Sequence, residues 1–108
     1  MAKYEQKIQG DFDTVLHTLH NGILSGSMSA TYEDGSDYCA DGVRCAVRVY
    51  ERYSYAGGNR VSMNVTLFQN GNDEIHLSAI TSGGSQAVLF KINTWGEEAF
   101  LDKLREIL

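Results

Sequence analysis

Three arginines and one tyrosine recur at even-numbered positions within one short stretch of the chain: Arg44, Arg48, Tyr50 and Arg52. In a β-strand, side chains at every second position share a face, so these four residues would form one basic and aromatic stripe. Proteins that bind single-stranded nucleic acid combine such cations with stacking aromatic rings. The stripe is therefore a candidate surface for a ligand or a partner.

The acidic residues just before the stripe offer a second interpretation. Residues 31–42 contain no Lys or Arg but several carboxylates: Glu33, Asp34, Asp37 and Asp41. In a hairpin, Glu33 and Asp37 would face the arginines and form cross-strand ion pairs worth ~0.2–1 kcal/mol each. A net charge of -5 also disfavours a nucleic-acid partner, because binding to phosphates draws mostly on Lys and Arg. The sequence favours internal ion pairs over anion binding.

A glycine-rich segment is the second candidate, because its backbone amides could bind an anion. It contains Gly83, Gly84 and Ser85. The spacing matches neither a dinucleotide-binding nor a P-loop motif, and the segment leads into an expected strand, whereas those motifs lead into a helix. A tight connection or a bulge is favoured, although glycines in a loop also allow a ligand to approach closely.

Histidines and cysteines supply the remaining reactive groups. His17 and His20 are three residues apart, but a zinc site needs three or four ligands, and we expect both to face solvent. Cys39 and Cys45 would lie opposite each other if a three-residue loop joined their strands, and could then form a disulfide, although buried thiols are expected in a cytoplasmic protein. We expect no metal and no cofactor, and no catalytic motif supports enzyme activity.

The longest alternating stretch, residues 43–55, predicts the central strand. We expect the arginine stripe to face water and the other face to form the core: Val43, Cys45, Val47, Val49, Tyr53 and Tyr55. Three-residue loops at 57–59 and 70–72 keep apolar faces aligned. They pair Tyr53 with Met63 and Val49 with Leu67 across the first loop. Across the second loop, they pair Leu67 with Ile75 and Val65 with Leu77.

Other segments complete an α+β domain. Residues 3–9 alternate like an edge strand, and Asp11 is suited to cap a helix that ends near Asn21-Gly22. The helix carries an apolar stripe: Phe12, Val15, Leu16, Leu19 and Ile23. A strand starting at Met28 ends at Glu33 or at Cys39. The run 87–92 predicts a buried strand.

The C-terminal segment predicts a second helix. Thr94 and Glu97 form a capping box, and an apolar stripe follows: Phe100, Leu101, Leu104, Ile107 and Leu108. The order β-α-β-β-β-β-β-α predicts a single two-layer α+β domain, in which two helices cover one face of a curved antiparallel sheet.

This order resembles the TATA-binding-protein-like and helix-grip arrangements, a resemblance of topology that implies no activity. The segment Thr81-Ser82-Gly83-Gly84-Ser85-Gln86, followed by Lys91-Ile92-Asn93-Thr94-Trp95-Gly96-Glu97, resembles small uncharacterised bacterial proteins of unknown function.

The length and composition of the chain restrict the classes of protein to which it can belong. The chain has 108 residues, of which 43% are hydrophobic, as in a soluble globular domain, and no stretch reaches the ~18 apolar residues of a membrane span. No apolar signal segment is visible, so we expect the cytoplasm.

We expect a non-catalytic binding or assembly module that associates with itself, as a homodimer, or with a partner protein. The contact would use a sheet edge or a tyrosine-rich surface: Tyr32, Tyr38, Tyr50, Tyr53 and Tyr55. The alternative is a carrier or enzyme for a small apolar ligand. Its pocket between helices and sheet would be lined by Phe12, Met63, Phe90, Trp95 and Phe100.

Truncation after Asn93 should unfold or aggregate the protein. Burial of four side chains, at about 1.5–3 kcal/mol each, is a large part of the roughly 5–15 kcal/mol that stabilises such a domain: Phe100, Leu101, Leu104 and Ile107. Thr94→Ala should cost about 1 kcal/mol through the lost cap. Circular dichroism and urea unfolding check both; a truncated chain that unfolds cooperatively with native strand content would contradict the expectation.

Overall fold

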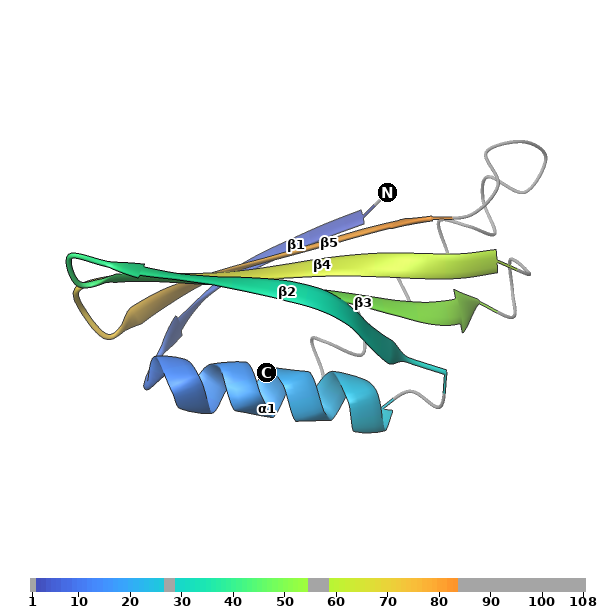
Figure 1. Cartoon of the computed structure of the whole chain (residues 1–108), viewed down its shortest axis with the longest axis horizontal. Coiled ribbons are helices and arrows are strands. Elements are labelled where there is room, and N and C mark those ends of the chain that lie inside the picture. Colours follow the sequence, from blue (N-terminus) through green and yellow to red (C-terminus); the bar gives the residue numbers. More distant parts are fainter. Residues whose placement is uncertain (1, 27–28, 55–58, 84–108) are drawn as a thin grey trace.

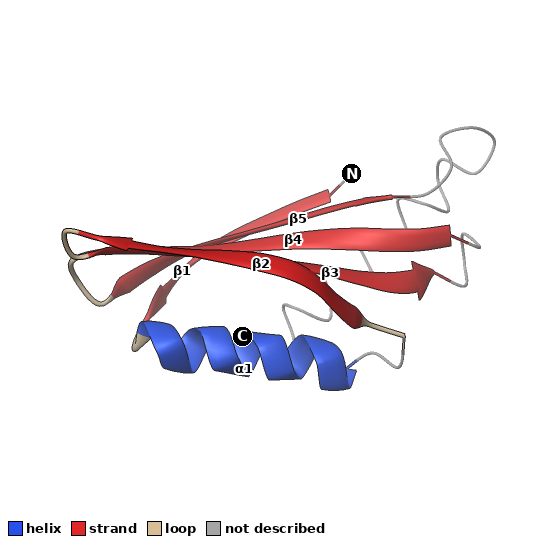
Figure 2. Ribbon diagram, in the orientation of Figure 1, coloured by secondary structure: helices blue, strands red, loops and turns tan. Residues whose placement is uncertain are grey.

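The computed structural model describes residues 2–26, 29–54 and 59–83. Its elements are β1 (Ala2–Gln9), α1 (Phe12–Gly26), β2 (Thr31–Ala40), β3 (Val43–Ser54), β4 (Asn59–Asn70) and β5 (Glu74–Gly83). The strands form one antiparallel sheet in the order β1-β5-β4-β3-β2. The sheet curls over α1, which lies along one face (Figures 1 and 2). We call this face inner and the opposite face outer. The strand expected at 87–92 and the helix expected from Thr94 lie outside the described residues.

Helix α1 begins where the sequence predicts and ends later. The Asp11 carboxylate accepts hydrogen bonds from the Thr14 backbone N–H at 3.0 Å and from the Thr14 hydroxyl at 2.8 Å, which confirms the cap. The expected stop at Asn21-Gly22 is wrong, because the helix continues to Gly26. Ile23 is 1% exposed in the core, and burying it offsets the cost of about 1 kcal/mol for Gly22 inside a helix.

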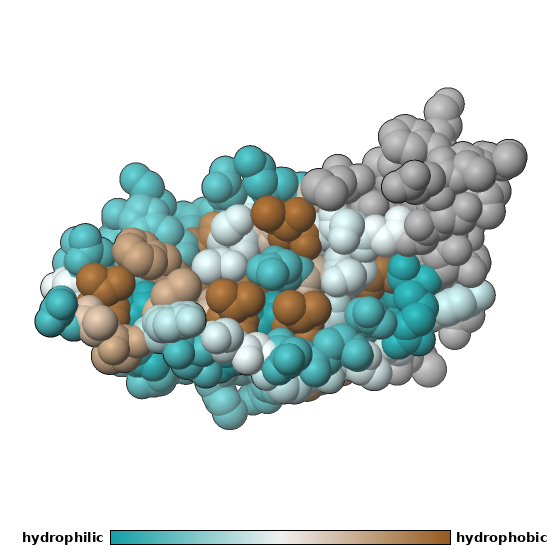
Figure 3. Space-filling model, turned by 45° about the horizontal axis from the view of Figure 1, so that its top comes forward, coloured by the Kyte–Doolittle hydropathy of each residue, from teal (hydrophilic) through white to brown (hydrophobic). Residues whose placement is uncertain are grey.

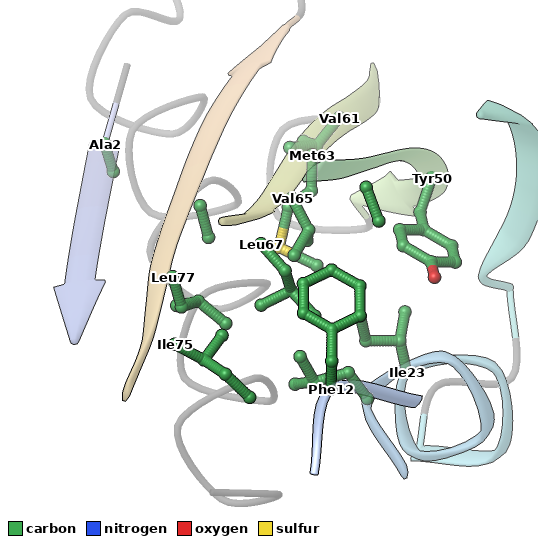
Figure 4. Close-up of a cluster of buried hydrophobic side chains, with 13 residues drawn as sticks. Ala2, Phe12, Ile23, Tyr50, Val61, Met63, Val65, Leu67, Ile75 and Leu77 are labelled. Atoms are coloured by element: carbon green, nitrogen blue, oxygen red, sulfur yellow. The ribbon is translucent and has the colours of Figure 1, made fainter. Parts of the chain in front are cut away.

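The core lies between α1 and the inner face of β4 and β5. The helix contributes Phe12, Leu19 and Ile23, and the two strands contribute Val61, Met63, Val65, Leu67, Ile75, Leu77 and Ala79. Side chains from the helix and from the strands point toward each other in Figure 4. The predicted inward faces of β4 and β5 are therefore confirmed. Their register differs by two residues, since Leu67 pairs with Leu77. An even displacement leaves every side chain on its predicted face.

Strand β3 presents the face opposite to the one predicted. Ala46 and Tyr50 are each 1% exposed on the inner face, while the expected core residues are half-buried on the outer face: Val43, Cys45, Val47 and Val49. Tyr50 pairs with Met63, where the sequence predicted Tyr53, so the register is displaced by three residues. An odd displacement exchanges the two faces. The inner face gains the large Tyr50 ring, and the long aliphatic parts of the arginines can cover apolar surface there.

The hairpin between β2 and β3 separates the two cysteines. Strand β2 extends to Ala40, and Asp41 and Gly42 form a two-residue turn with φ of 52° and 80°. Positive φ at both turn positions matches the twist of a tight hairpin. Cys39 therefore pairs with Arg44, while Cys45 lies one register position away and on the other face. The two-residue turn removes the condition for a disulfide, and both thiols are free as favoured; their expected burial is wrong, because Cys39 is exposed and Cys45 is half-buried.

Gly35 allows the aromatic side chain of Tyr32 to lie on the inner face of β2. The register shifts between Tyr32 and Asp34, which leaves Glu33 as an extra residue in a bulge. A Cβ atom at Gly35 would lie 2.6 Å from the Tyr32 hydroxyl, 2.8 Å from the Val47 carbonyl oxygen and 2.9 Å from Arg48 Cδ. Because one of these atoms is backbone, relaxation would have to move the strand.

Gly35→Ala should therefore reduce the free energy of unfolding by roughly 1–3 kcal/mol, measured in urea. Gly26→Ala is the matched control, because a Cβ there meets nothing within 4 Å, and it should be neutral or slightly stabilising. Equal stabilities for the two variants would show that the space above Gly35 is not filled as described.

Candidate functional site

A groove of about 430 Å³ lies between α1 and the strands β2 and β3. Its lining residues are Asp13, Leu16, His17, His20, Tyr32 and Arg48. The four helix residues are spaced by three or four positions, so they share one side of α1. The sequence placed Arg48 and Tyr32 in candidate contact surfaces and weighed the two histidines as metal ligands. It assigned Leu16 to the apolar stripe of the helix and did not single out Asp13. The helical spacing of residues 13, 16, 17 and 20 was the signal that could have grouped them.

Arg48 is held in place by its neighbours on β2 and β3. Its Nη2 donates to Asp37 Oδ1 at 3.1 Å, and its Nη1 donates to the carbonyl oxygens of Val47 at 2.9 Å and Ser36 at 3.4 Å. The predicted cross-strand ion pair with Asp37 is confirmed. The predicted role of Glu33 is not, because its carboxylate accepts a hydrogen bond from the Thr31 hydroxyl at 2.6 Å in the bulge.

Arg44 joins the other end of the stripe to α1. Its guanidinium carbon lies 4.3 Å from the centre of the Phe12 ring, and its Nη2 donates to Asp13 Oδ1 at 2.9 Å. This hydrogen bond lowers the pKa of Asp13 and raises that of Arg44. Burial lowers the pKa of Arg52, the third arginine. The stripe thus faces α1 and the core, and the prediction that it faces water is wrong.

His20 and two tyrosines form an aromatic cluster beside Arg48. His20 Nδ1 lies 2.8 Å from the Tyr50 hydroxyl oxygen, and the His20 ring contacts the Tyr32 ring edge-on at 5.2 Å between centroids. The prediction that His20 faces solvent is wrong, whereas His17 is exposed. Burial raises the pKa of Tyr50 to about 12, so its phenol stays protonated and can donate to His20. Burial, then Arg48 and His17, lower the pKa of His20.

The outer face of the sheet carries a separate apolar patch. Its members are the half-buried Val43, Cys45, Val47 and Val49 of β3, together with the exposed Tyr38, Tyr53, Phe68 and Ile80. Phe68 and Ile80 are each 39% exposed. Apolar residues, drawn in brown, lie on this side in several groups between white and teal ones (Figure 3). Among the described residues, the single helix lies on the other face, so none of their elements covers the patch.

The tyrosines expected to share one surface are divided between the two faces. Tyr32 pairs with Tyr50, which is buried on the inner face, whereas Tyr38 pairs with Cys45 on the outer face. Tyr53 also belongs to the apolar patch on the outer face, and Tyr55 lies outside the described residues. The curled sheet therefore offers an aromatic cluster at the groove and a mixed apolar patch outside.

Gly83 has a structural reason to be glycine. Its φ is 154°, and a Cβ there would lie 2.6 Å from the Arg60 carbonyl oxygen and 2.9 Å from the Val61 Cα. This close approach to β4 accounts for a glycine at the last position of β5. Gly84 and Ser85 lie outside the described residues.

The remaining expectations concern apolar pockets, metals and membranes. Phe12 and Met63, expected to line an apolar pocket, are 3% and 0% exposed in the core; Phe90, Trp95 and Phe100 lie outside the described ranges. In the described part of the chain, no group of three or more His, Cys, Asp or Glu is placed to hold a metal ion. No helix within residues 2–26, 29–54 and 59–83 has the length and apolarity to cross a membrane.

The fold and the groove define a small α+β protein whose antiparallel sheet has a helix on one face. Comparison with family models matches residues 1–108 to DUF6054, a family of unknown function, and the chain belongs to this family. No curated protein and no solved structure matches the chain. The resemblance to proteins of unknown function is thereby confirmed.

Tyr50→Phe should cost about 1 kcal/mol of unfolding free energy at pH 7.5 by removing the hydrogen bond to His20. Because the folded state raises the pKa of Tyr50 from 10.0 to about 12, the unfolded chain loses this proton first, and the tyrosine's contribution falls as pH rises from 10 towards 12. The penalty of Tyr50→Phe should therefore shrink over this range in urea unfolding. Tyr38→Phe, at a side chain 73% exposed, is the control and should stay within about 0.5 kcal/mol.

The lowered pKa of His20 gives the opposite slope in acid. The unfolded chain takes up this proton near pH 6.5, before the folded chain does, so the contribution of His20 is present above pH 6.5 and falls as the pH is lowered.

A penalty of Tyr50→Phe that stays constant from pH 8 to pH 12 would contradict the buried, hydrogen-bonded phenol.

Proposed function

We propose that this protein is a non-catalytic assembly module that self-associates by packing the outer face of its sheet against a second copy. The observation that carries this proposal is the apolar patch on the outer face. Exposed apolar patches of several hundred Å² on soluble proteins mark interaction sites. A second copy is the occupant that the size and charge of the face favour.

The size of the outer face fits a dimer. Five strands spaced about 4.8 Å apart span roughly 20–24 Å, and about ten residues per strand extend for roughly 34 Å. Their product is roughly 700–800 Å² per copy, close to the area that each partner buries in an interface of standard size. A two-fold axis would place the same patch on both sides of the contact.

The charges of the outer face also suit a second copy. Glu51 accepts a hydrogen bond from Arg60 Nε at 3.0 Å, and Lys3 lies 3.8 Å from Glu5 on the edge strand β1. These charges are balanced within one chain and flank the apolar centre. An apolar centre with a polar rim is the usual anatomy of a protein interface. Two identical faces can therefore meet without a block of like charge.

Full-length protein between 5 and 200 µM should show twice the 12.0 kDa chain mass in size-exclusion chromatography with light scattering. Ile80→Lys and Phe68→Lys should each raise the dissociation constant by roughly tenfold or more, because each places a charge in a desolvated interface. Thr18→Lys adds the same charge on the exposed side of α1 and should leave it unchanged.

The salt dependence separates this contact from a charge-driven one. Apolar burial is not screened, so the dimer should persist in 1 M NaCl. A strict monomer at tens of micromolar would overturn the proposal. Equal effects of Ile80→Lys and Thr18→Lys would place the contact elsewhere.

A further inference from the structure

We propose that the groove between α1 and the strands β2 and β3 binds a small organic carboxylate, with its anionic head at Arg48 and its apolar body against Leu16 and the Tyr32 ring. This site lies on the inner side of the sheet and its edge, whereas the proposed self-association uses the outer face. The two can therefore be tested separately.

Hydrogen-bond donors that have no partner within the described residues line this groove. A guanidinium has five N–H groups, and the bonds of Arg48 to Asp37, Val47 and Ser36 use three of them. Two N–H groups of Arg48 therefore remain available among the described residues. Tyr32 is 45% exposed, and its hydroxyl makes no hydrogen bond within the described part of the chain. Such an excess of donors favours a ligand that supplies acceptors.

His20 adds a third donor with a defined orientation. When the protonated Tyr50 hydroxyl donates to Nδ1 of the neutral imidazole, the ring proton resides on Nε2. His20 lines the groove, and Nε2 has no partner among the described residues. The Tyr50 bond and the edge-on contact with Tyr32 hold the ring in place before a ligand arrives. Preorganised donors reduce the entropy that binding would otherwise cost.

The distribution of charge around the groove favours an anion. The Arg48 side chain is 17% exposed, while its partner Asp37 is 62% exposed. Asp13, at the groove, is 71% exposed and paired with Arg44. Water screens the exposed carboxylates more than it screens the guanidinium, so the inner part of the groove keeps a positive potential. The charge of Arg48 helps to lower the pKa of His20, which is the effect of a positive potential at this imidazole.

The volume and the lining restrict the class of anion. At about 430 Å³, the groove is larger than an inorganic ion needs and lies within the range of sites for small organic ligands. Leu16 and the ring of Tyr32 offer apolar and aromatic surface for the body of such a ligand. Because Arg48 already shares its charge with Asp37, a single negative charge matches the groove better than the double charge of a phosphate.

Benzoate is the probe, and benzamide is its uncharged control of the same shape. In ¹H–¹⁵N correlation spectra of the full-length protein, benzoate should shift the amides of Leu16, His20, Tyr32 and Gly35 with a dissociation constant on the order of 1 mM. Benzamide should bind at least roughly tenfold more weakly, because it lacks the charge that Arg48 recognises. Acetate and inorganic phosphate, at matched ionic strength, test the contributions of the apolar body and of the charge.

Three variants test the assignment of residues. Arg48→Gln should weaken benzoate binding by roughly tenfold or more, and Tyr32→Phe by roughly threefold or more, because each removes donors to the carboxylate. Arg60→Gln removes the same charge from an ion pair on the outer face and should leave affinity unchanged. Tyr32→Phe keeps the ring over Gly35, so it tests the groove even if Arg48→Gln destabilises the hairpin.

Several results would overturn the inference. These are an absence of shifts at 20 mM benzoate, equal binding of benzamide, unchanged affinity in Tyr32→Phe, or tighter binding of phosphate than of benzoate. Ile80→Lys should bind benzoate with unchanged affinity whether or not the native protein is dimeric. Failure of the outer-face contact and failure of the groove are thereby distinguishable.

Discussion

The pairing of Tyr50 with Met63 sets the arrangement of the whole sheet. It directs the Tyr50 ring into the core below α1, and it directs Arg44 and Arg48 of the same strand towards the helix. The same pairing turns four small apolar residues of β3 to the outer face. Both candidate surfaces therefore depend on one strand register. A large side chain that is 1% exposed makes that register costly to change.

Local chemistry accounts for the parts of the fold that the sequence predicts well. The Asp11 cap, the apolar stripe of α1 and the inward faces of β4 and β5 depend on residues close in sequence, and the structure agrees. Which residues of β3 face the core depends on the register between β3 and β4. The sequence of the connecting residues 55–58 does not determine that register. Alternation in β3 gives two plausible faces, because one holds valines and the other holds Ala46, Tyr50 and long arginine stems. Only packing against α1 distinguishes them.

In the candidate groove, too, some contacts follow from the local sequence and others only from the packing of distant elements. Arg48 and Asp37 lie on adjoining strands, and the clustering of opposite charges in sequence was enough to predict their ion pair. The contact between His20 and Tyr50 joins residues 30 positions apart. It depends on which side of α1 faces the sheet. No local pattern encodes that orientation. The edge-on contact between His20 and Tyr32 follows from the same packing.

The free edge of β2 limits how copies of this chain can combine. Among the described strands, β2 lies at one edge of the sheet, and its bulge at Glu33 interrupts the straight row of backbone groups that another strand would need. Two such edges placed side by side would also bring the carboxylates of Glu33 and Asp34 in each copy together, and like charges on neighbouring strands are destabilising. Growth of the sheet from one molecule to the next is thereby discouraged at this edge. An open-ended fibre, in which sheets join edge to edge, is therefore disfavoured at β2.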